Sequence, residues 1–193
     1  MISEKQLRIK RLFDLTLVVM LLPLLLLPII VLMVAASFDT KNFGVFTQLR
    51  VGQNGKLFKI YKIRTLKDGV HRLGHLEKSA TPLGKYLRKT KLDELPQLFN
   101  VLKGDMSFVG PRPDIQGFAD MLEGEDQIIL KVKPGITGEA TIKYKNEELV
   151  LERQNDPEDY NRTIIWVDKV KINRNYVENY SFYLDLMLIL KSL

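Results

Sequence analysis

The chain has 193 residues, enough for one domain with a substantial hydrophobic core. Its net charge of +6 favours anionic partners such as nucleic acid, phosphorylated metabolites or a membrane surface. It contains no cysteine, which excludes a disulfide framework, a thiolate nucleophile and a cysteine-based metal site.

The first predicted element is an uncharged, strongly apolar segment over residues 15–38, LTLVVMLLPLLLLPIIVLMVAASF. As a straight α-helix it would be roughly 36 Å long, which exceeds the hydrocarbon core of a bilayer at about 30 Å. A cleaved signal peptide is an alternative, because basic residues precede the run and VAA at residues 34–36 resembles a cleavage site. The run is longer than a usual signal-peptide core, so the sequence favours a membrane segment that is retained.

Two features favour a re-entrant hairpin over a helix that spans the membrane. Pro23 and Pro28 lie within the segment, and each proline removes a helical hydrogen bond. Basic residues occur on both sides, so the positive-inside tendency assigns both flanks to the cytoplasm. We therefore expect residues 1–40 to form two half-helices, each roughly 18 Å long, that enter one leaflet and return, and residues 41–193 to form a cytosolic domain. The flanking basic residues are Lys5, Arg8, Lys10 and Arg11 before the segment and Lys41, Arg50 and Lys56 after it.

The cytosolic part predicts short mixed elements, hence an α+β fold that is mostly helical. Asn54-Gly55 lies between two stretches of partly alternating apolar residues and predicts a β-hairpin. Thr81-Pro82 predicts a helix start, with threonine as the N-cap and proline in the first turn.

Later elements are predicted by similar local signals. Asp93 is expected to cap the next helix, which would end at Gly104. A further helix near residues 115–130 and a turn at KPGITG, residues 133–138, should follow. The tail over residues 173–193 is typical of one last amphipathic helix, whose apolar face suits either the core or the membrane interface.

The stretch TKLDELPQLFNVLKGDMSFVGPRP, residues 90–113, carries the strongest chemical signal. Asp93-Glu94 could simply stabilise a helix start, but an ionised carboxylate there could also attack phosphorus. Like charges about 4 Å apart repel by roughly 4 kcal/mol at an effective dielectric near 20, so a carboxylate approaching a diphosphate needs cations. Arg112, stiffened between two prolines, fits that role together with Mg²⁺, although GPRP taken alone would favour a rigid surface turn.

Together these motifs resemble a known family, the monotopic bacterial sugar transferases, or polyprenyl-phosphate phosphoglycosyl transferases, in their small single-domain form. The resemblance runs from KRLFD at residues 10–14 almost to the C-terminus, and includes FTQLRVGQNGKLFKIYKIRT, LDELPQLFNVLKGDMSFVGPRP and KPGITG. It implies transfer of a sugar-1-phosphate from a UDP-sugar to polyprenyl (undecaprenyl) phosphate, with release of UMP. The reaction would occur at the cytoplasmic face of the bacterial inner membrane, as the first membrane step of exopolysaccharide, O-antigen or glycoprotein glycan synthesis. Downstream glycosyltransferases would act next.

The resemblance also implies roles for single residues. Asp93 matches the family's nucleophilic aspartate, which forms a covalent phosphosugar intermediate; Glu94 and Mg²⁺ assist, so both acids are candidate metal ligands. The family's membrane helix is re-entrant and broken at a Ser-Pro pair, of which Pro28 matches the proline while Leu27 replaces the serine. The sequence EATIKYKNEE after the PGITG motif departs from many relatives, which leaves the sugar open. The residues that suit phosphate binding are Lys62, Arg64, Arg88 and Arg112.

Two other functions stay open at this point. A membrane-anchored, metal-dependent glycosyltransferase would transfer the sugar alone and release UDP. A tethered module that binds anionic lipid or nucleic acid would need no chemistry, but it should show scattered basic and stacking residues rather than a clustered acid pair. We therefore expect a UDP-sugar, polyprenyl phosphate and membrane lipid as partners, and no nucleic acid.

Overall fold

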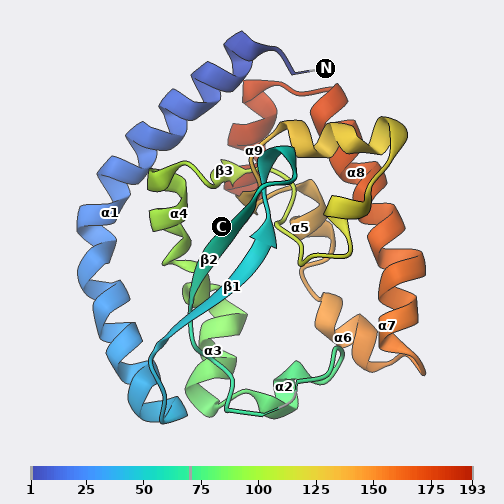
Figure 1. The fold of residues 1–193 in the computed structure, drawn as a ribbon. Helices are drawn as coiled ribbons and strands as arrows, with labels where there is room; N and C mark the ends of the chain where they lie inside the picture. Colours follow the sequence, from blue (N-terminus) through green and yellow to red (C-terminus); the bar gives the residue numbers. More distant parts are fainter. Residues whose placement is uncertain (1, 70, 193) are drawn as a thin grey trace.

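The computed structural model describes residues 2–69 and 71–192, and its first element is one long helix, α1 (Glu4–Thr40), which curves along one side of the molecule (Figure 1). Ser3 begins this helix with a capping box. Its hydroxyl accepts a hydrogen bond from the Gln6 amide, and its own amide donates to the Gln6 side chain. The start of α1 is therefore fixed by local hydrogen bonds.

The two prolines lie inside α1 without splitting it. The helix continues through Pro23 and Pro28 to Lys41, whose backbone is left-handed with φ 54°. The two half-helices expected from the sequence are thus not separate elements, and the helix bends gradually instead (Figure 1). Within the part of the chain that the structure describes, α1 is the one helix whose length and composition would allow it to cross a membrane. The predicted long apolar N-terminal helix is confirmed, whereas its re-entrant insertion stays a prediction.

One stripe of α1 packs against the rest of the protein. Val18 and Ile29 are buried in a hydrophobic cluster with β2 (Leu57–Ile63) and α4 (Gln97–Lys103). The opposite side of α1 is apolar but exposed, as Leu27 illustrates with 69% of its surface accessible. Such a contiguous apolar surface marks a contact with membrane or protein. Its members include Leu12, Val19, Met20, Leu24, Leu27, Val31, Val34 and Phe38.

The predicted β-hairpin is confirmed. Strand β1 (Val45–Val51) pairs antiparallel with β2, and the connecting turn holds Asn54 and Gly55 at positive φ values of 56° and 73°. Both residue types tolerate this backbone conformation well. The free edge of β2 is satisfied by Asn100 of α4, whose side-chain oxygen accepts a hydrogen bond from the Tyr61 amide at 3.1 Å. This bond fixes α4 against the hairpin.

Two short helices follow the hairpin, α2 (Leu76–Ser79) and α3 (Pro82–Thr90). The predicted start of α3 is confirmed, because the Thr81 hydroxyl accepts a hydrogen bond from the Gly84 amide at 2.9 Å. Proline occupies the first turn, where its missing N–H costs nothing.

The prediction that Asp93 caps α4 is wrong. Asp93 lies in a separate 3₁₀ turn, η2 (Leu92–Glu94), and α4 begins only after Pro96, which makes no side-chain cap. The predicted end of α4 is confirmed, since Gly104 closes it with a left-handed backbone at φ 96°. The acid pair is therefore displayed on a tight turn between two helices.

A second, parallel strand pair joins β3 (Ser107–Val109) to β4 (Gly135–Thr137). The segment between them was expected to form one helix near residues 115–130, and this expectation is confirmed only in part. It forms two 3₁₀ segments, η3 (Ala119–Met121) and η4 (Gly124–Lys131). Gly117, with φ 88°, turns the chain before the first of them and interrupts helical geometry.

The C-terminal part is helical, but the single tail helix expected from the sequence is wrong. Helical structure is interrupted between Asn179 and Ser181, and the hydroxyls of Tyr176 and Tyr180 both donate to Asp185 of the last helix, at 2.7 and 3.0 Å. The elements are α5 (Glu139–Lys143), α6 (Glu147–Glu152), α7 (Pro157–Tyr160), a π-helical turn η5 (Asn161–Ile165), α8 (Trp166–Glu178) and α9 (Phe182–Ser192).

Helix α9 also binds α1. Lys10 and Asp185 form a buried ion pair with an Nζ–Oδ2 distance of 2.5 Å. Leu188 of α9 is buried, whereas Tyr183 and Leu190 are 70% and 69% exposed. One face of α9 therefore belongs to the core, and the membrane-interface alternative stays a prediction for the other face. The expected α+β, mostly helical fold is confirmed.

Candidate active site

The acid pair lies at the centre of the candidate site. Both Asp93 and Glu94 are only 6% exposed. They sit in the turn η2, which begins where Lys91 takes a left-handed conformation (φ 58°) and ends α3. This reversal places the two carboxyl groups beside the hairpin strand β2, from which Lys62 extends.

Glu94 accepts hydrogen bonds from two basic side chains. Its Oε1 accepts hydrogen bonds from Arg112 Nη2 at 2.6 Å and from Lys62 Nζ at 3.0 Å, and its Oε2 accepts from Arg112 Nη1 at 3.4 Å. Burial alone would raise the pKa of Glu94, but the charges of Arg112 and Lys62 outweigh burial and hold that pKa well below its usual value. Glu94 is therefore ionised and serves as the anchor of both cations.

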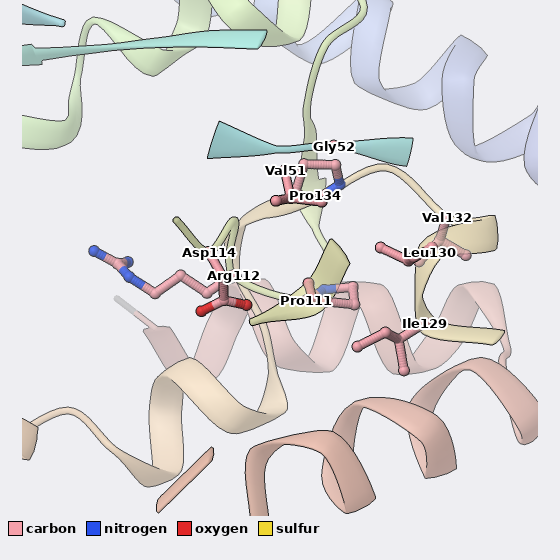
Figure 2. Close-up of a pocket in the computed structure, with 10 residues that line it drawn as sticks. Val51, Gly52, Pro111, Arg112, Asp114, Ile129, Leu130, Val132 and Pro134 are labelled. Carbon is pink, nitrogen blue, oxygen red and sulfur yellow. The ribbon is translucent and has the colours of Figure 1, made fainter. Parts of the chain in front are cut away.

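Arg112 is presented by a backbone segment fixed on two sides. The Gly135 amide donates to the Pro111 carbonyl at 2.8 Å, and the Val51 amide donates to the Asp114 carbonyl at 2.8 Å. Figure 2 shows the Arg112 side chain extending away from this segment. Glu94 raises the pKa of Arg112, and 34% of the arginine side chain stays exposed. Its remaining N–H groups can thus face an incoming anion.

Lys62 shares this environment. Its side chain is 17% exposed, and burial lowers its pKa while Glu94 opposes that shift. Because Glu94 accepts from both Lys62 and Arg112, two positive charges are held within a few ångströms of one another. Such an arrangement suits a phosphate group.

Asp93 differs from its neighbour. Its Oδ1 is buried and forms no hydrogen bond with the residues that the structure describes. Burial raises its pKa, Lys62 lowers it and Glu94 raises it further. Adjacent carboxylates in different surroundings often divide chemical roles, and here both oxygens of Glu94 bond to basic side chains while Oδ1 of Asp93 has no hydrogen bond.

The two other predicted phosphate ligands lie in different places. Arg88, in the last turn of α3, is among the charges that lower the pKa of Asp93, which places it beside the acid pair. Arg64 points elsewhere: its Nε donates to the Phe43 carbonyl at 2.9 Å, and its guanidinium lies over the Phe46 ring at 5.9 Å. The structure therefore brings Lys62 and Arg112 onto Glu94 and leaves Arg64 outside this set of contacts.

The sequence did not predict a cluster of further charged residues that lies next to Arg112. Lys169 donates to both oxygens of Glu147, at 2.8 and 2.7 Å. Arg50 and Asp114 lie near Arg112, since the positive charge of Arg112 lowers the pKa of both groups. These residues come from four separate parts of the chain, and only Asp114, directly after GPRP, adjoined a recognisable motif.

The cavity beside Arg112 is small. It has a volume of about 20 Å³ and is lined by Pro111, Arg112 and Asp114 together with apolar residues (Figure 2). That volume holds about one water molecule. This cavity therefore has no room for a substrate larger than water.

The acid pair fits a magnesium ion only in part. Mg²⁺ is usually held by one or two carboxylates together with substrate phosphates. The buried, unbonded Oδ1 of Asp93 suits such a ligand, whereas both oxygens of Glu94 already bond to cations. Within residues 2–69 and 71–192, no cluster of three or more acidic, histidine or cysteine side chains forms a ready-made metal site.

The comparison with known proteins identifies the family. The bacterial sugar transferase family matches residues 5–193, and the chain belongs to it. Similar proteins include the uncharacterized sugar transferase EpsL of Bacillus subtilis (strain 168), which is 37% identical over 94% of this chain and 83% of its own length.

Other relatives have more specific names. The UDP-glucose:undecaprenyl-phosphate glucose-1-phosphate transferase of Klebsiella pneumoniae is 36% identical over 93% of this chain and 38% of its own length. The UDP-N-acetylgalactosamine-undecaprenyl-phosphate N-acetylgalactosaminephosphotransferase of Aeromonas hydrophila is 32% identical over 96% of this chain and 43% of its own length. The chain thus spans less than half of these two longer relatives, whose names give different sugars.

Proposed function

We propose that the protein is a phosphoglycosyl transferase, which moves a sugar-1-phosphate from a UDP-sugar to polyprenyl phosphate and releases UMP. The observation that carries this proposal is the division of roles in the acid pair. Glu94 anchors two phosphate-binding cations, and Asp93 beside it keeps a carboxylate oxygen without a hydrogen bond. The names of the relatives support the same reaction class.

Asp93 is the proposed nucleophile. A carboxylate oxygen attacks the sugar-linked phosphorus of the donor and forms an acyl-phosphate bond, while the bond to the bridging oxygen breaks and UMP leaves. A phosphate oxygen of the lipid then attacks the same phosphorus. The acyl-phosphate bond breaks, Asp93 is regenerated, and the product is a polyprenyl diphosphosugar.

The cations make this attack feasible. An ionised carboxylate and a diphosphate repel each other by roughly 4 kcal/mol per charge pair at 4 Å and an effective dielectric near 20. Lys62 and Arg112 reduce that repulsion, and Glu94 keeps both in position without a reorganisation at the moment of reaction. Arg88 adds positive charge beside Asp93. We do not assign Arg64 to this group, because its contacts are with Phe43 and Phe46.

Mg²⁺ completes the proposed site. Asp93 is its proposed protein ligand through the unbonded oxygen, with Glu94 able to join only by sharing oxygens that bond to Lys62 and Arg112. When bound, the ion would neutralise part of the charge on the donor diphosphate.

The proposed membrane arrangement is re-entrant, with the site at the cytoplasmic face. Both ends of α1 contact the same body of the protein: Lys10 pairs with Asp185, and Ala36 packs with Ile63 and Leu87. A straight spanning helix would carry its two ends to opposite faces of the bilayer. The exposed apolar side of α1 would then contact lipid within one leaflet.

The product would enter glycan synthesis as a lipid-linked sugar. A polyprenyl diphosphosugar is the acceptor that downstream glycosyltransferases require, so the protein would start the assembly of an exopolysaccharide or a related glycan. This placement is supported by the name of one relative, the exopolysaccharide production protein ExoY of Sinorhizobium fredii (strain NBRC 101917 / NGR234).

The released nucleotide tests the proposal. Purified protein in detergent is incubated with polyprenyl phosphate, Mg²⁺ and a panel of UDP-sugars, and the nucleotide product is identified. UMP is expected, and chelation should stop its release until Mg²⁺ is restored. UDP would instead identify a glycosyltransferase that moves the sugar alone, and no turnover across a broad panel would favour a binding module.

A further inference from the structure

Asp114 is fixed in position, but its carboxylate is unused by the fold. The Val51 amide binds its carbonyl oxygen at 2.8 Å, and Arg50 binds the preceding carbonyl, that of Pro113, at 3.3 Å. The Asp114 side chain, in contrast, forms no hydrogen bond within residues 2–69 and 71–192. Neither of its oxygens is a fully buried atom without a partner, so both can accept hydrogen bonds from a ligand or from water.

The charges around Asp114 keep it ionised without bonding to it. Burial raises its pKa to about 6, against the opposing charges of Lys169, Arg50 and Arg112, and Glu147 raises it as well. Lys169 directs its ammonium to both oxygens of Glu147 rather than to Asp114. At neutral pH the group is therefore a carboxylate, which only accepts hydrogen bonds.

The position of Asp114 relative to Arg112 indicates what it meets. The two residues are separated by Pro113, which restricts Arg112 to extended backbone, and alternate side chains of an extended segment leave on the same side. The charge of Arg112 lowers the pKa of Asp114, which places the two charged groups near each other. A donor diphosphate at Arg112 would thus place the flanking hexose or ribose next to Asp114.

We propose that Asp114 accepts hydrogen bonds from hydroxyl groups of the bound UDP-sugar and so helps to select the donor. This inference rests on the proposed function. Both the ribose and the sugar of a nucleotide sugar carry hydroxyl groups that can donate hydrogen bonds. A carboxylate is the usual protein acceptor for such hydroxyls. The adjacent cavity of about 20 Å³ holds no more than a water molecule, so the hydroxyls would approach from the open side.

Analogues that lack single hydroxyls test this inference. KM and kcat for UMP release are measured with the parent UDP-sugar, with analogues deoxygenated on the hexose and with the 2′-deoxyribose analogue. The proteins are the wild type, Asp114→Asn and Asp114→Ala. We expect each substitution to raise KM about tenfold or more, because a hydrogen bond to a charged acceptor is lost. With the wild type, one analogue should show a similar rise in KM over the parent UDP-sugar. With the variants, that analogue and the parent should have almost the same KM.

The pattern identifies the bonded hydroxyl. Loss of discrimination against a deoxyhexose assigns Asp114 to the sugar, and loss against the deoxyribose analogue assigns it to the nucleoside. Glu123→Gln, an exposed acid in the same loop, should behave as the wild type. The inference is overturned if the variants have the same KM as the wild type for the parent UDP-sugar. It is also overturned if every analogue raises KM by the same factor in the variants as in the wild type. If the wild type releases no UMP from any donor, the proposed function itself fails and takes this inference with it. Thermal unfolding of both variants shows whether they are folded.

Discussion

Lys10 and Asp185 lie 175 residues apart in the chain, yet their side chains form an ion pair that is almost completely buried. The pair joins the first helix to the last one, and Tyr176 and Tyr180 complete the hydrogen bonds of the carboxylate. This contact holds the basic end of α1 against the C-terminal helices, so it should matter for folding more than surface ion pairs do.

Breaking this pair should destabilise the protein strongly. Asp185→Asn leaves the Lys10 ammonium buried without its counter-charge, which costs about 3–5 kcal/mol in comparable cases. Thermal unfolding in detergent measures the loss. The double variant Lys10→Met with Asp185→Leu should recover only part of it. It removes the ion pair as a unit, but the buried carboxylate of Asp14 loses the charge of Lys10, and the Tyr176 and Tyr180 hydroxyls lose their acceptor. Glu125→Gln, which removes a partner of Arg174 at the surface, should leave the unfolding midpoint nearly unchanged. Equal effects from the buried and the surface substitutions would contradict this assignment.

Arg112→Lys should lower kcat/KM about 100-fold while the protein stays folded. An ammonium offers three donors from a single atom, whereas the guanidinium places separate N–H groups on both oxygens of Glu94 and directs its remaining donors, in a fixed plane, toward a phosphate. Steady-state UMP release is the measurement. Lys103→Arg, a change at an exposed site, is the matched control and should keep full activity. A decrease in kcat/KM of less than threefold for Arg112→Lys would show that the bidentate contact is not needed for activity.

Asp114 should make stability depend on pH in a specific direction. Burial raises its pKa from 3.8 to about 6, so the folded protein holds this proton more tightly than the unfolded chain does. This group therefore lowers the free energy of unfolding as pH rises from about 4 through about 6, by roughly 1–3 kcal/mol in total. Asp114→Asn lacks that titration, so its stability relative to the wild type should increase across this window and level off above it. Unfolding midpoints of both proteins at matched pH values test this, and a difference independent of pH would contradict it.

The local signals in the sequence predicted the elements that local chemistry determines. The Thr81 cap, the turn at Asn54 and Gly55, and the helix end at Gly104 were all confirmed, because backbone conformation and nearby amides decide them. Asp93 failed as a helix cap because its place depends on tertiary contacts around η2, which local propensity does not contain.

The rest of the site depends on residues that are distant in sequence. Motif matching found Lys62, Glu94 and Arg112, which meet in the structure. Lys169 and Glu147 belong to no motif, and their relation to the GPRP segment appears only after α6 and α8 have packed. Arg64 matched a pattern but points away, since its direction follows from the carbonyl of Phe43.

The membrane topology can be tested with single cysteines, because the chain has none of its own. Thr40 is a poor labelling site because it is only 8% exposed. Glu4→Cys, at the first residue of α1, and Lys56→Cys, beyond its last residue, are preferable because both positions are exposed. If α1 is re-entrant, an impermeant thiol reagent should label neither variant in intact cells and both after permeabilisation. Labelling of one position alone in intact cells would establish a spanning helix.

The central claim is that Asp93 carries the sugar-1-phosphate between donor and lipid. Its most direct test is to incubate the protein with a UDP-sugar labelled in the sugar, without polyprenyl phosphate, and to locate the label by peptide mass spectrometry after acid quenching. We predict a phosphosugar on Asp93, its discharge on addition of polyprenyl phosphate, and no label or turnover in Asp93→Asn. An active protein that carries no label, or an Asp93→Asn variant with full activity, would contradict the mechanism.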